Sequence, residues 1–449
     1  MERERLGSRL GFILLSAGCA IGVGNVWKFP YMTGQYGGGA FVLVYILCLV
    51  LLGVPVMTIE FALGRASQKS PVKLYDALAK KGSKWNLHGY AAMVGNYVLM
   101  FFYTIVTGWM LRYFVDMASG KFVGASVEQV GNMFGQMMSQ PVALIVYVAI
   151  VVAIGITVCS MGVQKGVEKI TKVMMVALLG IMIVLAINCL FLPGASEGVK
   201  FYLVPNLQNM KNVGVGNVIV GAMNQAFFTL SLGMGSMAIF GSYLGKERAL
   251  LGEAVNVAVL DTFVALCAGM IIFPACFAYG VQPDSGPNLI FVTLPNIFNN
   301  LPMGRLWGSL FFVFMSFAAL STIIAVFENI IAMCMDLFGW DRKKTCMINA
   351  VVLFLGSIPC ALGFNVWSDF AIAGKGIMDL EDFFVSNLLL PLGSLTYVLF
   401  CVTRYGWGWD KFVAEANEGA VLKVANWMRP IMTFVLPILI LVIFVVGLL

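Results

Sequence analysis

Long apolar stretches recur along the whole chain and are separated by short polar or charged segments. A helix needs about 20 predominantly apolar residues to cross a bilayer. By this criterion the sequence predicts eleven membrane-spanning helices, over residues 11–33, 39–62, 88–115, 142–159, 164–192, 216–243, 252–281, 303–335, 345–363, 376–402 and 429–449. The first stretch follows a short basic segment and has no small-residue cleavage site, so we interpret it as a span and not as a cleaved signal peptide.

Glycine-rich runs interrupt two of these spans, the first and the sixth, near their middles. The first contains Gly22-Val-Gly24 and the sixth contains Gly233-Met-Gly235. An unwound helix frees backbone groups that lipid cannot satisfy, so such a break must line a cavity. One run alone would more simply reflect close helix packing, but two runs five spans apart indicate two halves of opposite topology with a binding site between them. The predicted organisation is one transporter domain over 1–449, with inverted repeats at 11–192 and 216–402 and an eleventh span at 429–449.

Composition and charge agree with a membrane protein. Hydrophobic residues make up 60% of the chain and charged residues 11%, whereas soluble domains are roughly a quarter charged. Most lysines and arginines fall on one side if the N-terminus is cytoplasmic, and the odd number of spans then places the C-terminus outside. The net charge of +6 therefore reflects orientation in the lipid bilayer, and we expect no nucleic-acid partner. Most of the ten cysteines lie in apolar stretches, and the single histidine, His88, is expected at the interface and not in a metal site.

Polar groups inside the spans are the candidates for chemistry, because they are costly in lipid and usually functional. The ionisable ones are Lys28, Glu60, Asp261, Glu328 and Asp382. In the eighth span Ala318, Ser321 and Thr322 are spaced i, i+3, i+4 and share one helical face. Their oxygen groups suit a hard cation such as sodium, although serine and threonine also bond back to their own helix.

Several strings carry a resemblance to a known family. They are Arg9-Leu-Gly-Phe12, Gly22-Val-Gly-Asn-Val-Trp-Lys-Phe-Pro30, Gly37-Gly-Gly-Ala-Phe41, Glu60-Phe-Ala-Leu-Gly-Arg65 and Phe227-Phe-Thr-Leu-Ser-Leu-Gly-Met-Gly235. With them the chain resembles the neurotransmitter:sodium symporter family, in its bacterial eleven-span amino-acid branch. The resemblance implies an all-helical membrane fold with broken first and sixth spans, and sodium-coupled import of an amino acid by alternating access. It implies a transporter and not an enzyme.

The resemblance also implies two sodium sites built from oxygen ligands. The first would comprise the Ala20 carbonyl with Asn25, Thr229, Asp261 and the substrate carboxylate. Because sodium and substrate then share a ligand, each improves the other's binding. The second would comprise carbonyls of Gly18, Ile21 and Ala318 and the hydroxyls of Ser321 and Thr322.

By the same resemblance a substrate pocket lies beside these ions. Its lining would be Cys19, Gly22, Val23, Gly24, Leu99, Tyr103, Val106, Phe228, Ser231, Met234, Thr322 and Val326. Tyr103 would bond the substrate carboxylate. Monoamine transporters of the family carry an acidic residue where this chain has Gly22, so an amino acid is favoured over an amine. The apolar side chains favour an aliphatic or aromatic one.

Gates and ion balance complete the expectations from the resemblance. Lys28 and Asp382 match the family's outer gating pair, Arg3 and Asp336 match the inner pair, and Glu60 would cap amides that the breaks release. Asp261 stands where many members have Asn, and Ala265 where others have the Ser of a chloride site or a Glu. We therefore expect no chloride requirement.

Other functions remain open at this stage. A transporter of the same fold could be coupled to protons or carry an osmolyte or amine, and a non-transporting sensor would bind an amino acid without flux. A channel or membrane enzyme would need a repeated filter or a catalytic cluster, and the sequence has neither. It does not predict the oligomeric state.

Overall fold

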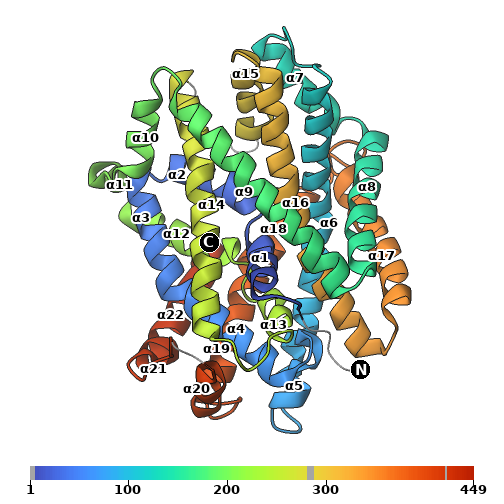
Figure 1. The fold of residues 1–449 in the computed structure, drawn as a ribbon, viewed down its shortest axis with the longest axis vertical. Coiled ribbons are helices and arrows are strands. Elements are labelled where there is room, and N and C mark those ends of the chain that lie inside the picture. Colours follow the sequence, from blue (N-terminus) through green and yellow to red (C-terminus); the bar gives the residue numbers. More distant parts are fainter. Residues whose placement is uncertain (1–5, 281–287, 420–421, 449) are drawn as a thin grey trace.

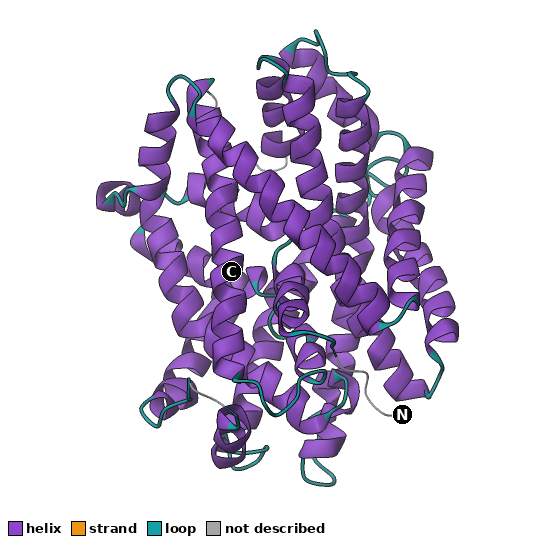
Figure 2. Ribbon diagram, viewed as in Figure 1, coloured by secondary structure: helices purple, strands orange, loops and turns teal. Residues whose placement is uncertain are grey.

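The computed structural model describes residues 6–280, 288–419 and 422–448, which form a bundle of packed helices (Figures 1 and 2). Across these ranges there is no β-strand, only an isolated bridge between Ile372 and Lys375. The all-helical fold class is therefore confirmed. The predicted span ends at residues 281 and 449 lie outside the described residues, as does Arg3.

Nine helical segments of the described chain are long and apolar enough to cross a membrane. They are Gly39–Ser67 (α3, Gly39–Cys48, continued by α4, Val54–Ser67), Asn86–Ala118 (α6), Pro141–Ser160 (α8), Val163–Leu190 (mostly α9, Lys169–Leu190), Leu250–Ala278 (α14), Gly304–Phe338 (α16), Arg342–Leu362 (α17), Ile377–Val402 (α18, Ile377–Phe383, continued to α19, Leu390–Val402) and Met428–Leu448 (α21, Met428–Pro430, continued to α22, Leu436–Leu448). Their ends lie within a few residues of the predicted spans.

The two remaining predicted spans are the broken ones. In the first, α1 (Arg9–Ala20) and the segment Gly24–Gln35, which ends in α2 (Phe29–Gln35), meet at a bend of 56°. In the sixth, α12 (Val215–Thr229) and α13 (Ser236–Gly241) flank an unwound segment. Counting the bent first pair gives up to ten spans by length and composition in the described residues. The sixth span, the short interrupted pair α12 and α13, is not among these ten. The total of eleven spans therefore stays a prediction.

Short helices that the apolar windows did not predict connect the spans. They are α5 (Pro71–Leu78), α7 (Val127–Met138), α10 (Ala195–Leu203), α11 (Leu207–Val213), α15 (Leu294–Asn299) and α20 (Trp409–Asn417). Most are too short or too polar to register as spans; α7 and α15 lie at one end of the bundle and α5 and α20 at the other (Figure 1).

The centre of the bundle is built around α16. In its most apolar stretch 83% of the residues are buried in the protein, against 28% for the last span. It packs against α6, α9 and α1 (Figure 1). Residues on these facing surfaces are shielded from lipid, so a polar group there must find its partner inside the protein.

Glycines let α13 lie directly on α4. A Cβ added to Gly64 would come 1.8 Å from the carbonyl oxygen of Ala238, and one added to Gly241 would come 2.5 Å from that of Phe61. This contact holds α13, the second half of the sixth span, against the second span, which explains Gly64 within the string Glu60–Arg65.

Candidate ion and substrate site

Side chains satisfy the backbone that the first break releases. Helix α1 ends at Ala20, and the amide of Gly22 then donates to Asn25 Oδ1 at 3.2 Å. The amide of Val23 donates to the Tyr103 hydroxyl oxygen at 2.9 Å. A buried amide without a partner is costly, so Asn25 and Tyr103 hold the unwound conformation in place.

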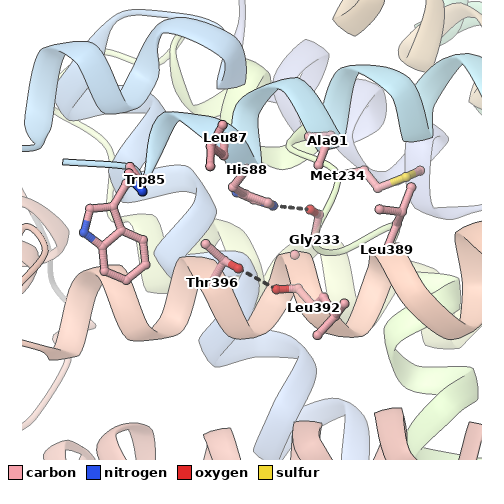
Figure 3. Close-up of a pocket in the computed structure, with 12 residues that line it drawn as sticks. Trp85, Leu87, His88, Ala91, Gly233, Met234, Leu389, Leu392 and Thr396 are labelled. Carbon is pink, nitrogen blue, oxygen red and sulfur yellow. Dashed lines mark hydrogen bonds between the residues drawn. The ribbon is translucent and has the colours of Figure 1, made fainter. Parts of the chain in front are cut away.

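The second break depends on glycine and on two ionisable side chains. Gly233 and Gly235 have φ of 91° and 79°, values that side chains other than glycine rarely adopt. The Gly233 amide donates to Glu60 Oε1 at 2.7 Å, as expected of Glu60. Its carbonyl lies 3.2 Å from His88 Nε2 (Figure 3). Both polar groups of one unwound residue are thus capped from other spans.

The role of His88 follows from this contact. A carbonyl only accepts, so Nε2 carries the proton, and in the neutral ring Nδ1 then accepts from the Tyr75 hydroxyl at 2.6 Å. His88 therefore stabilises the unwound segment of the sixth span through the Gly233 carbonyl, in addition to lying near the start of α6. Nothing in the sequence around His88 indicated this partner.

Asp261 lies at the meeting point of four spans. It is fully buried and accepts from Asn25 Nδ2 at 2.8 Å, Thr229 Oγ1 at 3.1 Å and the Tyr45 hydroxyl at 3.2 Å. No lysine or arginine of the described residues forms an ion pair with it. An isolated buried carboxylate is costly, so this group of oxygens is suited to a bound cation, and sodium prefers such ligands.

A second group of oxygens converges on Thr322. Its hydroxyl lies 3.2 Å from the Gly18 carbonyl oxygen and 3.4 Å from those of Ile21 and Ala318. A hydroxyl has one proton and can donate fully to only one of them, so the Thr322 hydroxyl does not satisfy all of these carbonyl oxygens. The Ser321 hydroxyl bonds the Ala318 carbonyl at 2.9 Å. This donor set also fits a sodium ion.

A small cavity of about 30 Å³ lies between the two oxygen groups. Its lining is Cys19, Ala20, Gly22, Gly24, Leu99, Tyr103, Phe228, Thr229, Ser231, Met234, Thr322, Val385 and Leu390. Nine of the twelve predicted substrate residues are among these. Val385 and Leu390, from the tenth span, were not predicted, because nothing in their local sequence distinguishes them from lipid-facing residues.

A larger cavity of about 530 Å³ adjoins the small one and shares Gly24, Tyr103 and Phe228 with it. Val23 and Val106, the next two predicted substrate residues, line it, whereas Val326 is buried and lines neither cavity. Tyr103 and Phe228 line both cavities and so form the partition between them. The inner cavity can hold a few water molecules at most, so a substrate requires this partition to move.

The predicted outer gating residues both line the larger cavity. The Lys28 ammonium lies 3.7 Å from the centroid of the Phe228 ring, and Asp382 accepts from Ser386 at 2.7 Å. Lys28 and Asp382, both within the described chain, do not form an ion pair with each other. Their pairing in a closed state stays a prediction.

At the opposite end of the bundle the predicted inner pair is only half described. Asp336 accepts from the amide of Ser70 at 2.7 Å, and Arg3 lies outside the described residues. A different pair is evident here. Arg342 binds both carboxylate oxygens of Glu328, at 2.7 and 3.0 Å, and Tyr243 donates to Glu328 at 2.8 Å.

We expect Glu328→Gln to destabilise the protein. The Glu328 side chain is fully buried and that of Arg342 is 15% exposed, and removing one partner of a buried pair costs about 3–5 kcal/mol because the other charge is left uncompensated. The melting temperature in detergent should fall clearly, while Lys343→Gln, at the exposed neighbour, should leave it unchanged. Equal melting temperatures for the two variants would contradict a stabilising pair.

Comparison with known proteins places this geometry in a family. The family model described as "Sodium:neurotransmitter symporter family" matches residues 3–130 and 122–449. The chain belongs to the sodium:neurotransmitter symporter family. It is thus a multi-pass membrane protein and a sodium-dependent symporter, and the relatives are transporters and not enzymes.

Three relatives give the symporter its context. It is 37% identical to the uncharacterized sodium-dependent transporter YhdH of Bacillus subtilis, over 97% of this chain and 96% of that one. It is 23% identical to a sodium- and chloride-dependent taurine transporter of Rattus norvegicus, over 95% of this chain and 75% of that one. The crystal structure of MhsT in complex with L-phenylalanine matches with a TM-score of 0.89 and 38% identity, over 99% of this chain and 100% of that chain.

Proposed function

We propose that this symporter imports a hydrophobic amino acid, aliphatic or aromatic, together with two sodium ions and without a requirement for chloride. The observation that carries the proposal is the convergence of two oxygen groups and an unwound backbone on one small cavity. Asp261 supplies a buried negative charge on one side, and Thr322 gathers carbonyls on the other. A cavity of this kind binds cations together with a small zwitterion.

The cavity walls support an amino acid as the substrate. The hydroxyl of Tyr103 accepts from the Val23 amide and can donate its own proton to a carboxylate near the start of the outer half of the first span, where the helix dipole also favours negative charge. Position 22 carries no acidic side chain to pair with an amine. The side-chain end is closed by Leu99, Met234 and Val385, and methionine adapts to several apolar shapes. Binding of phenylalanine to MhsT is consistent with this chemistry.

The two oxygen groups support two sodium sites. The first would use Asn25, Thr229, Asp261 and the Ala20 carbonyl, with the substrate carboxylate as the last ligand. The second would use the carbonyls and hydroxyls of α1 and α16 around Thr322. Since the first ion contacts the substrate, sodium binding and substrate binding favour each other.

Asp261 also supports independence from chloride. The rat relative is named as sodium- and chloride-dependent. Here a carboxylate already lies among Asn25, Thr229 and Tyr45, and Ala265, one helical turn further, has no hydroxyl to bind chloride. A fixed negative charge can balance sodium without a mobile anion.

Orientation, repeats and gates complete the proposal. The N-terminus faces the cytoplasm and the C-terminus the outside, because lysine and arginine then gather inside. Repeats at 11–192 and 216–402 rock against each other within a single domain. Lys28 and Asp382 close the outer side over Phe228, and Arg3 and Asp336 close the inner side.

Uptake into vesicles tests the proposal. Purified protein is reconstituted, and uptake of labelled leucine and phenylalanine is measured with an inward sodium gradient, with potassium in place of sodium, and with gluconate in place of chloride. We expect uptake that requires the sodium gradient and persists in gluconate. Uptake driven equally by a proton gradient, uptake of taurine or an amine in preference, or binding without accumulation would each contradict the proposal and favour one of the alternatives.

A further inference from the structure

A cavity of about 350 Å³, distinct from the two cavities described above, opens on the side of the bundle between α6 and α19 (Figure 3). Its lining comes from the residues just before α6 and from its first turns (Lys84, Trp85, Leu87, His88, Ala91 and Ala92), from the sixth-span break (Gly233 and Met234) and from the tenth span (Leu389, Leu392, Gly393 and Thr396). Leu87 is 63% and Leu392 39% exposed. The cavity, named here the lateral pocket, is therefore accessible from outside the protein.

The walls of the lateral pocket suit a hydrocarbon chain. Leu87, Ala91, Leu389 and Leu392 present alkyl groups (Figure 3). The polar groups facing it already have partners: Thr396 donates to the Leu392 carbonyl at 2.7 Å, and both His88 nitrogens are hydrogen bonded. A polar ligand group placed in this part would lose its water without gaining a partner.

The mouth of the lateral pocket is cationic. Exposed Lys84 lines the pocket, and exposed Lys80 and Lys81 lie three to four residues before it, in a turn closed by the hydrogen bond from the Ser83 amide to the Lys80 carbonyl. Trp85 donates to the Tyr405 carbonyl at 3.1 Å, and exposed Arg404, the residue before Tyr405, lies over the Tyr405 ring. No carboxylate in the described part of the chain forms an ion pair with any of these four cations.

We propose that the lateral pocket binds an anionic phospholipid, with one acyl chain between α6 and α19 and the headgroup at Lys84. An apolar slot beside unpaired lysines and an interfacial tryptophan at a span end matches an amphiphile in both parts. A zwitterionic lipid has no net negative charge to balance the positive charges of these lysines. A wholly apolar ligand would leave the cationic mouth unused.

The position of the lateral pocket links lipid binding to transport. Met234 lines both this pocket and the central cavity, and His88 holds the carbonyl of neighbouring Gly233. An acyl chain against Met234 limits how far that side chain can retreat from a substrate. Bound lipid should therefore change substrate affinity. Only this transport readout rests on the proposed function, because lipid binding is measured separately.

Fluorescence quenching tests the proposal directly. The full-length protein is reconstituted in phosphatidylcholine vesicles with increasing fractions of phosphatidylglycerol that is brominated in its acyl chains. Trp85 emission is taken as the difference between wild type and Trp85→Phe. We expect quenching that saturates at a low mole fraction of brominated phosphatidylglycerol. Brominated phosphatidylcholine should quench only in proportion to its amount.

Two sets of variants locate the site. Ala91→Phe fills the lateral pocket and should abolish the saturable quenching, whereas Val94→Phe, at a lipid-exposed position of the same helix, should retain it. Replacing Lys80, Lys81 and Lys84 together by Gln should weaken the preference for phosphatidylglycerol roughly tenfold or more. Lys343→Gln serves as the charge control. Melting temperatures verify that each variant is folded.

Three results would overturn the proposal: equal quenching by the two lipids, unchanged quenching in Ala91→Phe, or equal saturable quenching by a brominated free fatty acid without phosphatidylglycerol. If sodium-driven uptake is absent but quenching behaves as expected, the proposed transport function fails and the lipid site stands. If uptake is present and unaffected by Ala91→Phe while quenching is lost, the link through Met234 is wrong.

Discussion

Asp261→Asn is expected to raise the sodium concentration for half-maximal uptake at least tenfold, or to make uptake depend on chloride. The carboxylate is fully buried among Asn25, Thr229 and Tyr45, with no cationic side chain of the described structure paired with it. At an effective dielectric constant of 20, two unit charges 4 Å apart attract by about 4 kcal/mol. Even a third of that corresponds to tenfold in affinity. The asparagine side chain keeps the shape of aspartate and one oxygen ligand. Any loss of sodium affinity therefore measures the effect of the negative charge alone.

The measurement is uptake against sodium concentration in chloride and in gluconate. Asp369→Asn is the matched control, because it makes the same chemical change at an exposed loop position. It should leave both curves unchanged. If Asp261→Asn left sodium dependence unchanged and created no chloride dependence, Asp261 could not be the ion ligand that also replaces chloride.

Gly22→Ala is expected to reduce substrate uptake at least tenfold. An added Cβ would lie 2.4 Å from the Tyr103 hydroxyl oxygen and 2.7 Å from Thr322 Oγ1. Both distances are far below van der Waals contact, so both side chains must shift. The change would thus disturb the partner of the Val23 amide and the centre of the second oxygen group together.

Gly180→Ala is the control for this variant, since its added methyl group would meet nothing within 4 Å. It lies within a membrane span, in α9, and should support normal uptake and equal expression. Binding of labelled substrate at saturating sodium separates loss of affinity from loss of turnover. Normal binding and uptake by Gly22→Ala would contradict the prediction, because they would show that the space around Gly22 can accept a methyl group.

The sequence predicted the spans well because lipid imposes a simple rule. Every lipid-facing backbone group must bond within its own helix, so spans appear as long apolar windows. The same rule explains why the glycine runs at Gly22 and Gly233 stood out. The short helices α5, α10 and α20 were missed because they lie outside this rule.

Motif resemblance predicted the site residues by position, and the structure places most of them together. Nine of the predicted substrate residues line the inner cavity, and Val23 and Val106 line the outer one. Val326 faces neither cavity, and Val385 and Leu390 were absent from the prediction. An apolar residue in a span has the same local pattern whether it faces substrate, neighbouring helix or lipid, so only packing distinguishes them.

The sequence by itself determined that this protein spans a membrane and that its first and sixth spans break. These conclusions depend on apolar length and residue type, which are local properties. The oxygen ligands for sodium beside the breaks are implied by the family resemblance and stay a prediction. Glu60 was expected to cap an amide of the breaks, but only the tertiary structure decided that this amide is that of Gly233, and that His88, Asn25 and Tyr103 are the other caps. The tertiary structure also decided that Met234 lines both the lateral pocket and the central cavity. Such pairings join residues up to 173 positions apart, and helix packing, not the local sequence, brings them together.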